Sequence, residues 1–174
     1  MEFSVAHSVE VLRVTPYVLR AMLSGLSDEW LYSNEGKDTW SPFDILGHLI
    51  HGEKTDWVPR MNIILSGNND RKFKPFDRFA QLELNKGKSI SDLLNEFEVL
   101  RAENIGILES ENLTADQLML TGIHPEFGRV DLKQLLATWI VHDLNHISQI
   151  SRVMASQYSG YVGPWKTYLS ILTK

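Results

Sequence analysis

The sequence predicts an all-α protein, a four-helix bundle built as one domain that spans residues 1–174. Four long segments place apolar residues three and four positions apart, which is the spacing of one face of an α-helix. Capping residues stand at the start of several of these segments, and no strand pattern, internal repeat or linker competes with them. Amphipathic helices bury their apolar faces against one another, so a bundle follows.

The first helix is expected over about residues 3–25. Val5 and Val9 begin an apolar stripe with helical spacing that continues to Leu26. Pro16 falls on the same stripe. Because proline cannot donate the intrahelical hydrogen bond, we expect it to kink the helix.

The second helix is expected from Ser41 to about Ser66. Serine suits the N-cap, Pro42 suits the first helical position, and Asp44 completes a pattern resembling a capping box. A glycine and two asparagines then end the helix. Pro59, inside this segment, predicts a second kink.

A long connection and a third helix are expected next. Residues 70–88 contain three aromatic residues without a sustained period, and their number exceeds what a tight turn needs. We therefore expect an ordered connection. The third helix should begin at Ser89 or Ser91 and end before Asn112.

The fourth helix is expected from a cap at Asp131, with Gln134 three residues later, to about Ser156. A glycine-containing stretch then leads into a short tail. We expect the apolar and aromatic residues of this tail to pack back on the bundle: Trp165, Tyr168, Leu169, Ile171 and Leu172.

Composition and charge exclude several classes of protein. The chain has no cysteine, so disulfides, zinc fingers and a protein thiol nucleophile are excluded. Its 17 Lys and Arg against 22 Asp and Glu give a net charge of −5, which argues against a nucleic-acid partner. Neither a signal peptide nor a membrane-spanning stretch is present, so we expect a soluble cytoplasmic protein without a membrane partner.

Two histidines interrupt the apolar stripe of the fourth helix. His142 and His146 lie between Trp139 and Val153 on one helical face. Residues four apart on a helix lie one above the other, so both imidazoles can reach one metal ion. Buried neutral imidazoles would otherwise need partners for both of their nitrogens. This pair therefore predicts a metal site.

A third ligand of the site has to come from upstream. A metalloprotease motif would need Glu directly after the first histidine, where this chain has Asp143, and no Asp, Glu or His follows His146. The upstream histidines are His7, His48, His51 and His124. His7 points away from the apolar stripe and His124 lies in a loop. His48 and His51 share the second helix, and periodicity alone does not decide between them.

Two segments of the chain together resemble the DinB-like (DinB/YfiT) family. They are the run from Trp40 to Leu49, with a Trp-Ser helix start and a histidine eight residues after the tryptophan, and the His-x-x-x-His-x-x-Gln-Ile run from His142 to Ile150. The resemblance implies an up-down-down-up four-helix bundle with a long connection between helices 2 and 3, usually dimeric. It also implies a divalent metal ion held by three histidines, which match His48, His142 and His146.

Such a site would leave at least one coordination position open, as catalytic sites do. The resemblance implies a thiol-dependent S-transferase that activates a small thiol on the metal and acts on a small-molecule substrate. The alternative is a hydrolase in which the metal lowers the pKa of a bound water. A further alternative is a non-catalytic, metal-stabilised stress-response or interaction module. All-nitrogen ligation suits several ions, of which zinc is the first choice and nickel the second.

The sequence does not decide the roles of several residues near the three histidines. Asp44 could orient a ligand imidazole or serve only the helix start. Gln149 could line the pocket or hydrogen-bond a ligand ring, and Asp143 could be a solvated or an interhelical group. Trp40 and Trp57 are expected to be core or staple residues outside the site.

Overall fold

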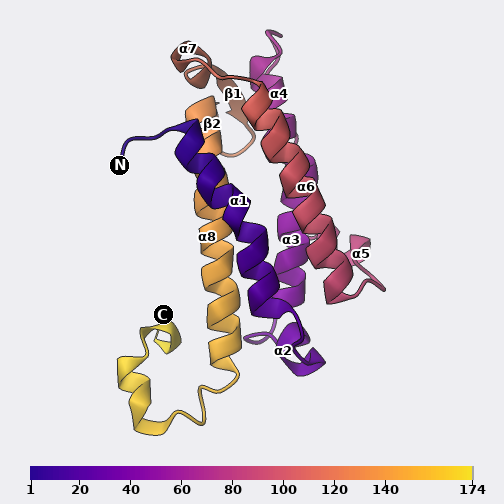
Figure 1. Ribbon diagram of the computed structural model, residues 1–174, viewed down its shortest axis with the longest axis vertical. Coiled ribbons are helices and arrows are strands. Elements are labelled where there is room, and N and C mark those ends of the chain that lie inside the picture. Colours follow the sequence, from indigo (N-terminus) through magenta and orange to yellow (C-terminus); the bar gives the residue numbers. More distant parts are fainter. Residues whose placement is uncertain (174) are drawn as a thin grey trace.

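The structure is a computed structural model that describes residues 1–173, and it is a four-helix bundle (Figure 1). Its long elements are α1 (Val5–Leu23), α3 (Pro42–Thr55) continued by α4 (Trp57–Leu65), α6 (Ile90–Ser110) and α8 (Leu132–Ser156). The short elements are α2 (Asp28–Tyr32), α5 (Ala80–Leu84), α7 (Ala115–Leu118), β1 (Thr121–His124), β2 (Gly128–Asp131), η1 (Gly163–Tyr168) and η2 (Ser170–Leu172).

The predicted fold class and helix directions are confirmed. In Figure 1, α1 and α8 run one way along the bundle, while α3 with α4 and α6 run the other way. Two consecutive helices with the same direction need a connection that returns along the bundle. Residues 66–89 make this connection and contain α5, and we call them the crossover.

Reciprocal caps fix where the helices begin. The Ser41 hydroxyl accepts from the Asp44 backbone N–H, and the Asp44 carboxylate accepts from the Ser41 backbone N–H, as the sequence predicts. The same reciprocal bonding starts α8 at Asp131 with Gln134, and it starts α6 at Ser89. Each cap satisfies backbone donors that the first helical turn cannot pair internally.

The two prolines have different effects. The second predicted helix is divided at Asp56, because Pro59 has no N–H to donate to the carbonyl of Thr55. At Pro16, in contrast, α1 is continuous, and the carbonyl four residues earlier, that of Leu12, accepts a hydrogen bond from Arg101 on α6 at 2.9 Å. A side chain from another helix thus replaces the missing backbone donor.

A β-hairpin between α7 and α8 corrects the prediction that strands are absent. β1 and β2 are antiparallel, and Gly128 has a φ of +71°, which allows the chain to reverse over a short loop. β1 also pairs with the crossover, because the Phe73 N–H donates to the carbonyl of Ile123. A Cβ at Gly122 would collide with the Phe73 ring, so glycine permits this close approach.

The C-terminal tail packs back on the bundle only in part, so a second prediction needs correction for its aromatic residues. Trp165 and Tyr168 are 69% and 86% exposed, so these two rings do not pack back on the bundle. Gly163, with a φ of +54°, begins η1, and the tail leaves the end of α8 and then returns, so that η2 contacts α8 (Figure 1). Leu172 is half-buried.

The core is divided by a layer of buried charge. One apolar cluster contains Leu12 and Trp139, and a second contains Leu19 and Phe97 near the other end of the bundle. Glu53 on α3, Arg101 on α6 and Asp143 on α8 each fall, along the sequence, between residues of one cluster and residues of the other. All three side chains are buried. None of the described helices combines the length and apolar character needed to cross a membrane.

Candidate metal centre

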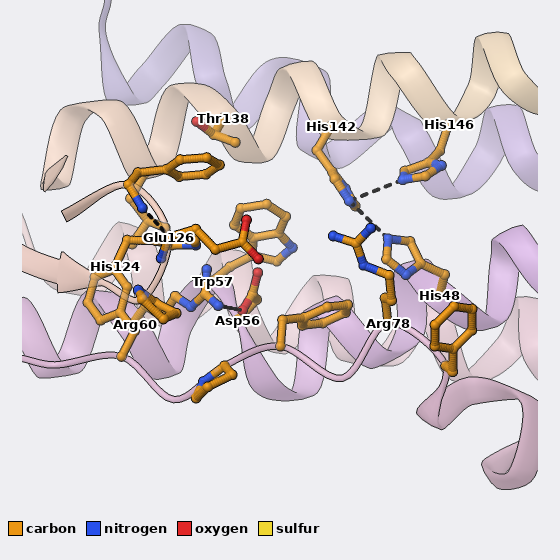
Figure 2. A pocket seen from close by; sticks show the side chains of 18 of the residues that line it. His48, Asp56, Trp57, Arg60, Arg78, His124, Glu126, Thr138, His142 and His146 are labelled. Atoms are coloured by element: carbon orange, nitrogen blue, oxygen red, sulfur yellow. Dashed lines mark hydrogen bonds and ion pairs between the residues drawn. The ribbon is translucent and has the colours of Figure 1, made fainter.

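Three histidine rings from two helices converge on one point (Figure 2). His48 comes from α3, and His142 and His146 come from successive turns of α8. The Nε2 atom of His142 lies 3.1 Å from Nε2 of His48 and 3.1 Å from Nε2 of His146. The structure thus brings together all three residues that the family resemblance selects.

The spacing of these nitrogens fits a single metal ion. Tetrahedral ligation with metal–nitrogen bonds of about 2.0–2.1 Å places two ligand nitrogens about 3.3 Å apart. Two of the three Nε2 separations, both 3.1 Å, are close to this value, and all three ligand atoms lie within 4.8 Å of one another. Within residues 1–173, the cluster contains these three residues and no fourth protein ligand. The arrangement has the donor set of a site with an open position.

Burial keeps these imidazoles neutral, as metal ligation requires. Burial lowers the pKa of His48 to about 3, and repulsion of a second positive charge beside His146, His51 and Arg78 acts in the same direction. Burial, with the charges of His146, His48 and Arg101, likewise lowers the pKa of His142 to about 3. Neutral imidazole carries the nitrogen lone pair that binds a metal ion.

Gln149 fixes the tautomer of His146. The Nδ1–H of His146 donates to Oε1 of Gln149 at 2.7 Å, which leaves the lone pair on Nε2, the nitrogen that faces the other two rings. A hydrogen bond at the distal nitrogen orients a ligand imidazole and increases its basicity. Of the two roles left open by the sequence, Gln149 thus bonds a histidine of the cluster, and it also lines the cavity.

Replacement of Gln149 by alanine should weaken metal binding by about 10- to 100-fold, the usual cost of losing a hydrogen bond to a ligand. The reason is that Nδ1 of His146 loses its acceptor and the ring loses its fixed orientation. Metal affinity can be measured by competition with a chromophoric chelator. Asn145→Ala, an exposed change on the same helix, is the control and should keep the wild-type affinity. Equal affinities for the two variants would contradict this role.

The histidines open into a cavity of about 720 Å³. Its walls come from α3, α4, α8, the hairpin and the crossover. Trp40 and Trp57 line it, with ring centroids 4.8 Å from the His48 ring and 5.1 Å from the His142 ring. Both tryptophans belong to the core, as expected, Trp57 in one apolar cluster and Trp40 against the other, but they also line the cavity, so they are not outside it.

A second polar group lies in the same cavity, away from the histidines (Figure 2). Arg60 and Asp56 form an ion pair of 2.6 Å, and the Arg60 guanidinium lies 5.2 Å from the centre of the Phe73 ring. Burial raises the pKa of Asp56 to about 6, although Arg60 opposes the shift. The His124 ring stacks on Phe127 beside this pair.

The remaining upstream candidates do not join the cluster. His7 is exposed, as the sequence predicts. The His51 ring packs against Phe76, with centroids 4.8 Å apart, and does not belong to the three-histidine group. Asp44 accepts hydrogen bonds from the backbone and hydroxyl of Ser41 at 3.0 and 2.7 Å, so its carboxylate serves the helix start.

Asp143 is an interhelical ion-pair partner rather than a solvated group. Arg101 on α6 donates to both of its carboxylate oxygens, at 2.6 and 3.1 Å, and to Glu53 on α3 at 2.8 Å. Glu53 also accepts from the indole N–H of Trp139 at 3.0 Å and from Asn104 at 2.9 Å. This network joins α3, α6 and α8, the helices that include both histidine-bearing elements.

Sequence reasoning missed Arg101 and the crossover residues that line the cavity. Arg101 had a detectable signal, because it follows Phe97 by one helical turn and so lies on an apolar stripe. Phe73, Phe76 and Arg78 had no such signal. The crossover has no period that could indicate which of its side chains face the helices.

A family model described as the DinB superfamily matches residues 12–150. The chain belongs to the DinB superfamily. The resemblance found in the Trp40 and His142 segments is thereby confirmed. No curated protein sequence matches this chain.

Two solved structures are similar to this one. YfiT from Bacillus subtilis, described as a "probable metal-dependent hydrolase with an unusual four-helix bundle topology", is 20% identical, with a TM-score of 0.72 over 93% of this chain and 91% of that one. The four-helix bundle protein TT2238 is 18% identical, with a TM-score of 0.56 over 84% of this chain and 97% of that one. At these identities the likeness establishes the bundle fold.

Proposed function

We propose that this protein is a metal-dependent enzyme that transfers a small thiol to an electrophilic small molecule. His48, His142 and His146 are the proposed metal ligands, and the proposed cofactor is a divalent ion, zinc first and nickel second. The observation that carries the proposal is the position of three neutral imidazoles at the wall of a cavity of about 720 Å³.

The open side of the cluster supports an enzyme over a metal-stabilised structural module. A structural zinc site is normally closed by four protein ligands, whereas catalytic sites keep a position for water or substrate. In the part of the chain that the structure describes, three histidines form the cluster, and all three line the cavity. A ligand in the cavity could therefore reach the site directly.

His48, His142 and His146 would hold a divalent ion, which would lower the pKa of a bound thiol or water and so supply a nucleophile at neutral pH. The rings of Trp40 and Trp57 form apolar walls beside His48 and His142. Gln149 keeps the lone pair of His146 directed at the centre. In the proposed transfer, the sulfur forms a bond to the electrophilic carbon, the leaving group departs with its bonding pair, and the thiol proton passes to solvent.

The volume of the cavity is suited to two reactants. Small-molecule pockets commonly enclose about 300–1,000 Å³. A cavity of about 720 Å³ offers space for a small thiol and an electrophile together. The lack of any cysteine in the chain means that the thiol has to be a co-substrate.

Loading the protein with zinc, and separately with nickel, and offering thiols with several electrophiles tests this function. We expect thioether formation above the uncatalysed rate with one of these ions, and the loss of that excess in His142→Ala. The excess should be unchanged in His51→Ala, because His51 lies outside the cluster. Thioether formation at the uncatalysed rate with both ions would contradict the proposal.

Hydrolysis is the second candidate function. It is favoured by the fold likeness to YfiT, which is described as a probable metal-dependent hydrolase. Asp56, a cavity carboxyl with a pKa near 6, is a group that could exchange protons at neutral pH. Metal-dependent turnover of esters or amides without added thiol would select this function over S-transfer.

A further inference from the structure

Arg78 is a cationic side chain of the crossover that lies at the histidine cluster. It lines the cavity, and Figure 2 shows its guanidinium directed toward the space beside His48 and His142. The crossover thus supplies a charge to a site whose histidines all come from helices.

The hydrogen-bonding capacity of Arg78 is unused. Two other arginines that line the cavity are paired: Arg60 with Asp56 at 2.6 Å, and Arg152 with Glu35 at 2.7 and 2.9 Å. Within residues 1–173, no hydrogen bond or ion pair joins Arg78 to another residue. A guanidinium has five N–H donors in a planar fork that matches a carboxylate.

The charge at this end of the cavity is positive once a metal ion is bound. Three neutral imidazoles do not reduce the charge of a divalent ion, and Arg78 adds a further positive charge in the same cavity. Like charges that lie close together repel each other. An anionic group between the two would remove this repulsion and pair the free guanidinium donors.

We propose that Arg78 selects a negatively charged ligand, with a carboxylate as its recognised group, for the open side of the three-histidine centre. The inference rests on the proposed metal site, and it applies to a thiol co-substrate and to a hydrolysed substrate alike. Arg78 is a specificity-determining residue in this account: it binds the carboxylate of the ligand, while the histidines hold the ion that takes the reacting atom.

Two thiols of similar size test this selection in cobalt-loaded protein. Mercaptoacetate carries a carboxylate and 2-mercaptoethanol carries a hydroxyl, and binding of either can be followed by the change in the visible absorption of cobalt. We expect the wild-type protein to bind mercaptoacetate about 10- to 100-fold more tightly, the range for charge-assisted hydrogen bonds. In Arg78→Gln the ratio of the two dissociation constants should fall to near one.

The matched control is Lys74→Gln, which removes one positive charge from the same crossover at an exposed position outside the cavity lining. It should keep the wild-type ratio, and Arg78→Lys should keep part of it. Cobalt content and circular dichroism of Arg78→Gln should equal those of the wild type, because the side chain is exposed and pairs with no described residue.

Three results separate failure of this inference from failure of the metal site. If Arg78→Gln holds cobalt and keeps the preference for mercaptoacetate, the carboxylate binds the ion itself and the role of Arg78 is overturned. If both thiols bind equally to cobalt-loaded wild-type protein, the inference is also overturned while the metal site stands. If wild-type protein holds no cobalt at the histidines, the proposed function and this inference both fail.

Discussion

Replacement of His48, His142 or His146 by alanine should reduce the affinity for a divalent ion by more than about 100-fold, since loss of a hydrogen bond to a ligand alone costs 10- to 100-fold. Each substitution removes one of the three nitrogens that meet in the cluster. The Nε2 of His142 is 3.1 Å from both of the others, so its loss leaves the remaining pair without the central ring. Elemental analysis after gel filtration measures the bound metal.

His51→Ala is the matched control for these variants. His51 is also a helix α3 histidine, three residues from His48, but its ring packs on Phe76 outside the cluster. Its replacement should leave about one ion per chain. Full metal retention in His142→Ala, or equal loss in His51→Ala, would contradict the ligand assignment.

Replacement of Arg101 by methionine should lower the free energy of unfolding by about 3–5 kcal/mol, the cost of breaking a buried ion pair. Arg101 is 1% exposed and donates to Glu53, to Asp143 and to the Leu12 carbonyl. Both carboxylates would be left buried without their cation. The carbonyl that Pro16 leaves unpaired would also lose its donor. Urea unfolding followed by circular dichroism gives the measurement.

Arg13→Met is the control for this prediction. Arg13 pairs with Glu109 at 2.8 Å, but the two side chains are 58% and 51% exposed, and exposed pairs contribute at most about 1 kcal/mol. Combining Arg101→Met with Glu53→Met and Asp143→Leu should recover part of the loss, because no buried charge then remains unpaired. If Arg101→Met alone lowers the free energy of unfolding by less than about 1 kcal/mol, the buried network of Glu53, Arg101 and Asp143 does not have the stabilising role given to it here.

The bundle could be predicted because its signals are local. The 3/4 spacing of apolar residues locates α1, α3 with α4, α6 and α8, and the capping pairs at Ser41 and Asp131 locate the starts of two of them. The hairpin was missed because its two strands are only four residues each and β1 pairs partly with the distant crossover. Such pairing has no periodic signal in the sequence.

The candidate site could be predicted in part. His142 and His146 are on one helix, where spacing alone brings their rings together. His48 is 94 residues away from His142, and its place depends on how α3 packs against α8. Helical periodicity did not decide whether His48 or His51 is the third ligand, and the family resemblance was needed to choose between them.

Local sequence patterns could not predict the charge interactions between residues that are far apart in the sequence. Arg101 meets Asp143 and Glu53 across distances of 42 and 48 residues. Arg78 approaches the histidines only through the path of the crossover. The single domain over residues 1–174, the homodimer, the identity of the ion and the cytoplasmic location stay predictions.

X-ray absorption spectroscopy of the zinc-loaded protein tests the central claim most directly, because it reports the atoms bound to the ion. We expect one zinc per chain with three imidazole nitrogens at about 2.0–2.1 Å and one exchangeable oxygen ligand. The spectrum of His142→Ala should lose an imidazole. A wild-type spectrum dominated by oxygen ligands, without imidazole scattering, would contradict a metal centre at His48, His142 and His146.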